Sequence, residues 1–299
     1  MLDSKQVKEI AARIGFDLCG ITRAEPLQES EERFRQWLKN GYGEPLEYLS
    51  KYMELRFDTS RLFDGGQSVI VCAINYRSEQ SVEVTHPRIA SYALRRDYHK
   101  VIKKRLKALL KALKDQYPTI EGRPFCDSAP LLEKQLAQSA GLGWIGRQSL
   151  LVTPQFGSYV LLGELIVNMP CDSYDTPYTE SGCKGCRSCI DRCPVGAIND
   201  NLTIDTRRCI SSRTVEIAHD TSELTLSNWI FGCDECQICC PHNANKPLHS
   251  LTDFDSVITP PSKEEWLKMD DTEFQNLAVG TPLKRSSLGR IQRIIKKEL

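Results

Sequence analysis

The stretch Cys183-Lys-Gly-Cys186-Arg-Ser-Cys189-Ile-Asp-Arg-Cys193-Pro194 decides how the second half of the chain folds. Its pattern is C-x2-C-x2-C-x3-C-P, in which three thiolates surround one [4Fe–4S] cluster while the fourth cysteine ligates another cluster. A zinc site would instead combine two C-x2-C pairs separated by a longer segment. The triple spacing and the final Cys-Pro therefore predict two [4Fe–4S] clusters.

A second cysteine run, CDECQICCP at 233–241, supplies further ligands. Because its Cys-Pro ending repeats that of the first run, we assign Cys240 to the first cluster. Two candidates remain for the last ligand of the second cluster. Cys209, at the end of a predicted strand, is favoured over Cys239, because adjacent cysteines rarely reach different irons without strain. The predicted ligands are Cys183, Cys186, Cys189 and Cys240 for the first cluster, and Cys193, Cys209, Cys233 and Cys236 for the second.

Composition limits the cellular setting and the partners. The 299 residues include 39 basic and 39 acidic side chains, so any RNA-binding surface must be local. No run approaches the roughly 20 apolar residues that span a bilayer, and the N-terminus has neither a secretory nor a twin-arginine signal. We expect a cytoplasmic protein without a membrane partner, whose thirteen cysteines serve metal binding rather than disulfides.

Upstream of the cysteines, helical and strand periodicities alternate, which predicts an α/β or α+β domain. The predicted helices span 4–14, 28–39, 97–115 and 130–140, and the predicted strands span 68–76 and 158–169. The sequence GLGWIG at 141–146 matches a dinucleotide fingerprint only formally, because a helix rather than a strand precedes it. The last fifty residues are expected to be helical, and they become basic toward the end.

Several motifs together resemble the epoxyqueuosine reductase family, which performs the last step of queuosine synthesis on tRNA. They are GFDLCGIT at 15–22, RIASYALRRDYHKVIKKRL at 88–106, D-x-x-P-L-x-E at 127–133, AGLGW-x-G at 140–146 and CDECQICCPHN at 233–243. The resemblance covers nearly the whole chain and implies an α+β fold. It implies a nitroreductase-like cobalamin-binding domain at 1–170, a two-cluster ferredoxin-like domain at 171–246 and a short helical, basic tail at 247–299.

The resemblance also implies a reaction and its cofactors. An external low-potential donor delivers electrons through both clusters to a base-off cobalamin, and an epoxide becomes an alkene. Asp127 matches the family's general acid. Since an ordinary aspartate has a pKa of about 3.9, donation at neutral pH requires burial or bound substrate to raise it. Alternatively, Asp127 only caps the helix predicted from residue 130. The implied cobalamin contacts are Arg56, Asp127, Arg147, Ser149, Leu150, Gly157 and Ser158.

The implied substrate is a tRNA anticodon stem-loop that carries epoxyqueuosine. Two basic surfaces are candidates for phosphate contacts, the helix at 100–114 and the tail with Lys296 and Lys297, although each also fits a solvated helix face. His99 is the histidine of most interest. A monomer is expected. One alternative function is a reductive dehalogenase, but such enzymes are normally exported with a twin-arginine signal and use a tyrosine as their acid. The other alternative is a ferredoxin-like electron carrier or a cobalamin reductase, and about 170 residues before the cysteines are too many for a simple carrier.

Overall fold

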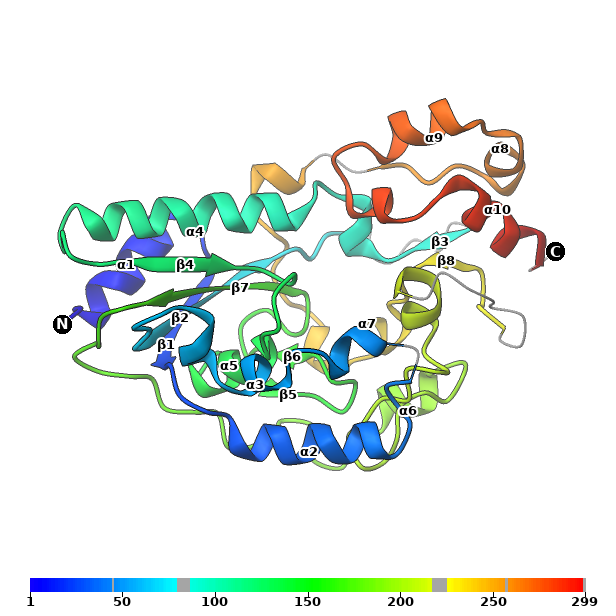
Figure 1. Ribbon diagram of the computed structural model, residues 1–299. Helices are drawn as coiled ribbons and strands as arrows, with labels where there is room; N and C mark the ends of the chain where they lie inside the picture. Colours follow the sequence, from blue (N-terminus) through cyan, green and yellow to red (C-terminus); the bar gives the residue numbers. More distant parts are fainter. Residues whose placement is uncertain (45, 80–86, 217–224, 256–257, 298–299) are drawn as a thin grey trace.

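A four-stranded antiparallel sheet forms the centre of the molecule. A computed structural model describes residues 1–44, 46–79, 87–216, 225–255 and 258–297 (Figure 1). The strands lie in the order β1-β2-β7-β4, and their bounds are Leu18–Arg23, Ser68–Asn75, Val160–Val167 and Gly122–Phe125. Every residue of β2 is buried, as expected for an apolar strand covered on both faces.

Helices cover both faces of this sheet and bury two hydrophobic cores (Figure 1). α1 (Ser4–Ile14) and α4 (Tyr98–Lys114) pack on one face. α5 (Glu133–Ser139) packs on the other. The buried stripe of α4 follows helical spacing and consists of Val101, Ile102, Leu106, Leu109 and Leu113. Its lysines lie on the opposite, exposed face.

The cysteine-rich segment follows β7 and contains only short elements. α6 (Ser188–Arg192) and α7 (Glu235–Ile238) pack against each other. Strand β8 (Trp229–Phe231) pairs in parallel with β3 (Arg88–Ile89). This pairing connects the cysteine-rich segment to a part of the chain that precedes it by more than a hundred residues, and it places the segment beside the sheet domain.

α2 (Gln28–Lys39) extends from the sheet domain toward α6 (Figure 1). No residue of this helix is buried. The indole Nε1 of Trp37 donates to the carbonyl oxygen of Ile204 at 2.7 Å, so the helix touches the cysteine-rich segment. The remaining short elements are α3 at Met53–Phe57, β5 at Trp144–Ile145 and β6 at Leu151–Val152.

The C-terminal residues are helical, as predicted, and they pack onto the rest of the chain. α8, α9 and α10 span Lys263–Lys268, Asp271–Ala278 and Leu288–Lys297. Capping boxes built on Ser262 and Asp270 begin α8 and α9. The apolar face of α10 joins one hydrophobic cluster with β8 and with residues 89–93. Its opposite face leaves Lys296 and Lys297 exposed.

The predicted mixture of helices and strands is confirmed, with three local differences. The helix predicted from residue 130 begins at Glu133, because residues 127–132 form turns in which Asp127 has a φ of 57°. The strand predicted before Cys209 is only a single bridge between Ile198 and Ile204. β1 and β4 were not predicted. Within the described ranges, no helix is long and apolar enough to cross a membrane.

Candidate active site and cluster ligands

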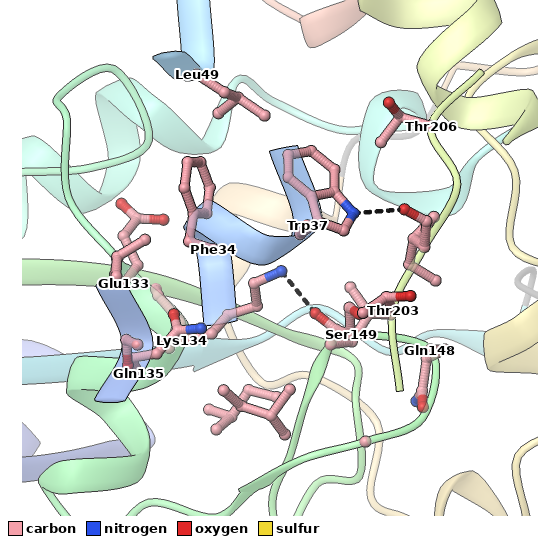
Figure 2. Close-up of a pocket in the computed structure, with 18 of the residues that line it drawn as sticks. Phe34, Trp37, Leu49, Glu133, Lys134, Gln135, Gln148, Ser149, Thr203 and Thr206 are labelled. Carbon is pink, nitrogen blue, oxygen red and sulfur yellow. Dashed lines mark hydrogen bonds between the residues drawn. The ribbon is translucent and has the colours of Figure 1, made fainter. Parts of the chain in front are cut away.

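A cavity of about 2900 Å³ lies between the sheet domain and the cysteine-rich segment. Its lining includes α2, the turns before α5, the segment 144–151 and parts of the segments 193–211 and 233–237. Figure 2 shows Phe34 and Trp37 of α2 facing side chains from α5 and from the loop around Ser149. The Nζ of Lys134 donates to the carbonyl oxygen of Ser149 at 2.6 Å and holds this loop to α5.

Most of the residues predicted to contact a cofactor meet in this cavity. The members that line it are Arg56, Asp127, Ser149, Leu150 and Ser158. Arg147 and Gly157 lie outside the lining. Arg147 Nη2 donates to the carbonyl oxygen of Lys184 at 3.1 Å, so its guanidinium contacts the first cysteine run instead.

Gly157 and Ser158 join the sheet domain to the turn after Cys240. A Cβ on Gly157 would stand 2.0 Å from the Oδ1 of Asn243, and the residue has a φ of 62°, so only glycine fits there. The backbone N–H of Ser158 donates to the same Oδ1 at 2.7 Å. Its hydroxyl donates to the Oε1 of Gln237 at 3.0 Å. We call these contacts the 157–158 clamp.

Three buried donors in the cavity wall lack partners within the described residues: Arg56 Nε, Trp144 Nε1 and Gln148 Nε2. Leaving such groups unpaired costs free energy, which a ligand rich in oxygen atoms would recover after small side-chain rotations. Cobalamin is large and carries many amide oxygens and a phosphate. The volume and the unpaired donors therefore fit the cofactor that the family resemblance implies.

Asp127 does not cap a helix. α5 begins six residues later, and its N-cap residue Leu132 makes no side-chain cap bond. The Oδ2 of Asp127 instead lies 2.8 Å from the Nε2 of His99. The Nδ1 of His99 lies 2.7 Å from the Oδ1 of Asp97, which also caps α4. Asp127 therefore belongs to an Asp–His–Asp chain of hydrogen bonds and is not the helix cap that was the alternative interpretation of its sequence.

The electrostatics of this chain place the proton on the histidine. The hydrogen bond from His99 lowers the pKa of Asp127 and outweighs burial, which raises it. Burial lowers the pKa of His99, but its bonds to Asp127 and Asp97 outweigh that effect and raise it to about 9. The raised aspartate pKa that donation seemed to require is thus not observed here. The imidazolium carries the proton at neutral pH, in direct contact with Asp127.

The His99 chain predicts a pH-dependent stability. Replacement by glutamine should cost about 2 kcal/mol at pH 6, less than the full shift implies because Asp127 is partly exposed. Since the folded pKa of His99 is raised, this contribution is complete below the unfolded value of 6.5 and disappears as pH rises through about 9. Urea unfolding of both proteins at pH 6 and pH 9.5 measures it. An equal deficit at both pH values would contradict the charged pair.

The cysteines gather in two groups. Burial raises the pKa of Cys189, and the thiols of Cys183, Cys240 and Cys186 add to this effect. Burial raises the pKa of Cys236 in the same way, and the thiols of Cys233 and Cys209 add more to this than the thiol of Cys189 does. Among the described residues, no three His, Cys, Asp or Glu side chains converge to hold a single metal ion.

The last two candidate ligands belong to different groups. The thiol of Cys193 helps to raise the pKa of the half-buried Cys209, whereas the thiols that help to raise the pKa of Cys239 are those of Cys189 and Cys240, in the first group. These mutual effects follow the two sets of four that the spacing favoured, and the ligand assignment itself stays a prediction. All four members of the second group line the cavity, and none of the first group does. A cluster on the second group would stand next to any ligand in the cavity.

Sequence reasoning missed several side chains around Asp127. Arg285, from the C-terminal segment, lines the cavity and helps to lower the pKa of Asp127. Tyr98 also hydrogen-bonds to Asp127. Glu133 and Glu164 stand behind it. Two sequence features could have pointed to some of these residues. The D-x-x-P-L-x-E motif contains Glu133, and Tyr98 stands between Asp97 and His99 in the sequence.

The fold and the site define an iron–sulfur protein with a large ligand cavity beside one cysteine group. Residues 56–128 match the family model "Epoxyqueuosine reductase QueG, DUF1730". Residues 182–243 match a 4Fe-4S double cluster binding domain. The epoxyqueuosine reductase of Cyclobacterium marinum is 37% identical over 97% of this chain and 94% of its own length. That of Escherichia coli is 34% identical over 94% and 76%.

Solved structures agree. An epoxyqueuosine reductase with a tRNA-Tyr epoxyqueuosine-modified stem loop superimposes with a TM-score of 0.87 at 27% identity, over 99% of this chain and 80% of that one. The Bacillus subtilis enzyme with its catalytic aspartate loop swung out of the active site gives 0.86 at 27%, with the same coverage. The chain belongs to the epoxyqueuosine reductase family.

Proposed function

We propose that this chain reduces epoxyqueuosine to queuosine at the wobble position of tRNA, the last step of queuosine biosynthesis. The observation that carries the proposal is that the second cysteine group and Asp127 line one cavity. Electrons and protons can therefore reach the same bound substrate. Membership of the family supports this reaction over the two alternative functions, a reductive dehalogenase and an electron carrier.

The two [4Fe–4S] clusters are assigned to the cysteine groups described above. A base-off cobalamin is assigned to the cavity, where Arg56, Ser149, Leu150 and Ser158 would hold it beside Asp127. When bound, it supplies a strongly reducing cobalt centre. His99 is the one histidine in the described lining, and its two ring nitrogens are occupied by Asp97 and Asp127. It is therefore not free to ligate cobalt, and a base-off cofactor in this cavity would be held without a histidine ligand.

The residues of the chain supply protons and orientation. Loss of the epoxide oxygen as water consumes two electrons and two protons, and the oxygen leaves readily only when it is protonated. The His99 imidazolium holds a proton next to Asp127, and Asp127 faces the cavity with its side chain 45% exposed. We assign Asp127 as the group that passes this proton to the substrate oxygen, with His99 as its source.

The domain division stays a proposal: a nitroreductase-like cobalamin domain at 1–170, a ferredoxin-like domain at 171–246 and a helical tail at 247–299. We further propose a cytoplasmic monomer that accepts electrons from an external low-potential donor. The packing of α10 with β8 and residues 89–93 makes the tail part of one core with the ferredoxin-like segment.

The tail is our candidate for tRNA contact. Its Arg285 lines the cavity, which supports a role for this segment in substrate binding. Lys296 and Lys297 of α10 are exposed and belong to the same C-terminal segment. Charge reversal of both lysines should weaken tRNA binding roughly tenfold in low salt and reduce its salt dependence, because phosphate contacts release counterions.

The matched control for this prediction is charge reversal of Lys107 and Lys111, which are exposed on α4. That change has the same total charge but lies on the other basic surface. Filter binding of the anticodon stem-loop at several salt concentrations measures both variants. Equal losses in the two variants would show that only net charge matters, and an unchanged affinity in the tail variant would remove the tail from the interface.

The proposed function is tested by direct assay. Purified protein with reconstituted clusters, cobalamin and a low-potential chemical reductant is incubated with epoxyqueuosine-tRNA, and digested nucleosides are quantified by mass spectrometry. Queuosine should form only when both cobalamin and reductant are present. A fully loaded protein that forms none would overturn the proposal.

A further inference from the structure

Glu164 is a buried acid in the middle of the sheet. It lies on β7 opposite Val71 of β2 and Phe125 of β4, so all three side chains are on the α5 side. Its exposure is 0%. Neither carboxyl oxygen has a basic or N–H partner within the described residues. An acid in this position costs stability, and a leucine would pack there without that cost.

Glu133 connects this acid to the cavity. It begins α5 and lines the cavity, as Figure 2 shows. Its Oε1 accepts a short hydrogen bond from the backbone N–H of Asp127. α5 packs on β7, and each of the two carboxyl groups acts on the pKa of the other, with a hydrogen bond between them among the causes. Two ionised carboxylates have no donor between them, so this contact is a hydrogen bond only when one of the two is protonated.

The surroundings keep a proton on this pair. Burial raises the pKa of Glu133 to about 7, against the opposing effect of the Asp127 N–H. Burial raises the pKa of Glu164 well above its usual value, and the charge of Glu133 adds to this. The other titratable groups that face the pair, from α4, α5, β2 and the end of β4, are Tyr98, Lys134, Cys72, Cys126 and Asp127.

We propose that Glu133 and Glu164 share one proton and that Glu133 delivers it into the cavity as the second proton of the epoxide reduction. This inference rests on the proposed function. The first proton comes from His99 through Asp127, the two electrons come from the donor through the clusters, and the oxygen leaves as water. Glu164 gives up its share of that proton to Glu133 during the delivery, and water reprotonates the pair between turnovers.

Glu133→Gln removes the proton that Glu133 would deliver but keeps its hydrogen bond to the backbone of Asp127. The amide oxygen still accepts the Asp127 N–H, so the turn stays in place, but no acidic proton is available. We expect kcat to fall about 100-fold or more, with little change in KM for tRNA and in iron content. Glu121→Gln, an exposed glutamate just before β4, is the matched control and should behave as wild type.

The pH profile supplies the readout that a structural role would not move. Wild-type kcat should fall as pH rises through about 7, where Glu133 loses its proton. In Glu164→Gln, the introduced amide donates to the Glu133 anion and removes a neighbouring acid, so this fall should move to lower pH. Infrared spectra of the substrate-free protein should show a buried carboxylic acid at pH 7 that Glu164→Gln lacks.

The outcomes distinguish this inference from the function on which it rests. If wild type makes queuosine while Glu133→Gln keeps wild-type kcat, or Glu164→Gln keeps the wild-type pH profile, the proton pair is wrong and the function stands. If wild type makes no queuosine with any reductant, the function fails whatever the infrared spectra show. Absence of the protonated carboxyl band in wild type would overturn the shared proton directly.

Discussion

Asp127→Asn should retain both clusters and bind cobalamin, yet turn over about 100- to 10,000-fold more slowly than wild type, the usual contribution of a general acid. The amide has the same shape as the carboxyl group, and its oxygen can still accept the hydrogen bond from His99 Nε2. It cannot take that proton and pass it to an epoxide oxygen. Removing the negative charge also lowers the pKa of His99, so less imidazolium is present at neutral pH.

Single-turnover formation of queuosine, with iron content and cobalamin absorbance measured on the same samples, tests this expectation. Asp64→Asn changes an exposed aspartate and should leave all three quantities at their wild-type values. Asp97→Asn should have an intermediate effect, because Asp97 only orients and charges His99 from its far side. Wild-type turnover in Asp127→Asn would remove Asp127 from the reaction, and loss of cobalamin would make it a binding residue instead.

Cys209→Ala should abolish turnover altogether. With its fourth ligand gone, the second cluster is lost, and iron should fall from about eight to about four atoms per chain. Cys239→Ala should keep both clusters and most of the activity, since this thiol lies beside the first group, where four ligands are already present. Alanine is chosen because a serine oxygen can still ligate iron.

Iron and sulfide analysis, with electron paramagnetic resonance of the reduced protein, distinguishes the two variants. In wild type and Cys239→Ala, two interacting clusters should be seen, and in Cys209→Ala a single isolated one. The reverse pattern would assign Cys239 to the second cluster, and the preference drawn from spacing would be wrong. Loss of iron in both variants would mean that Cys239 is needed for assembly of the first group.

Sequence patterns predicted those parts of the structure that depend on residues close together in the chain. The cysteine spacing predicted two groups of four, and the apolar stripe of α4 predicted a helix whose lysines face solvent. β1 escaped notice because its sequence LCGITR contains a glycine and ends in a polar residue. β4 is only four residues long and includes a proline, so it has neither the length nor the composition of a strand.

The proton chemistry of the site depends on contacts that no local pattern encodes. His99 and Asp127 are 28 residues apart and meet because α4 and β4 pack side by side. Glu133 and Glu164 meet only when α5 covers β7. From sequence, the apolar neighbours of Asp127 were visible, but the histidine that lowers its pKa was not. The basic residues of the tail could be seen in the sequence. That its apolar face packs on the rest of the chain, and that Arg285 lines the cavity, could be seen only in the structure.

The 157–158 clamp has a consequence for the speed of electron flow. Electrons cross a protein by tunnelling, and the rate falls steeply as the gap between donor and acceptor widens. The clamp joins Ser158, which lines the cavity, to Gln237 and Asn243, which lie on either side of Cys239 and Cys240 in the sequence. It acts as a spacer of fixed length, set by two hydrogen bonds and the missing Cβ of Gly157. Gly157→Ala removes none of the proposed ligands, but its methyl group would push Asn243 away, and electron transfer should slow.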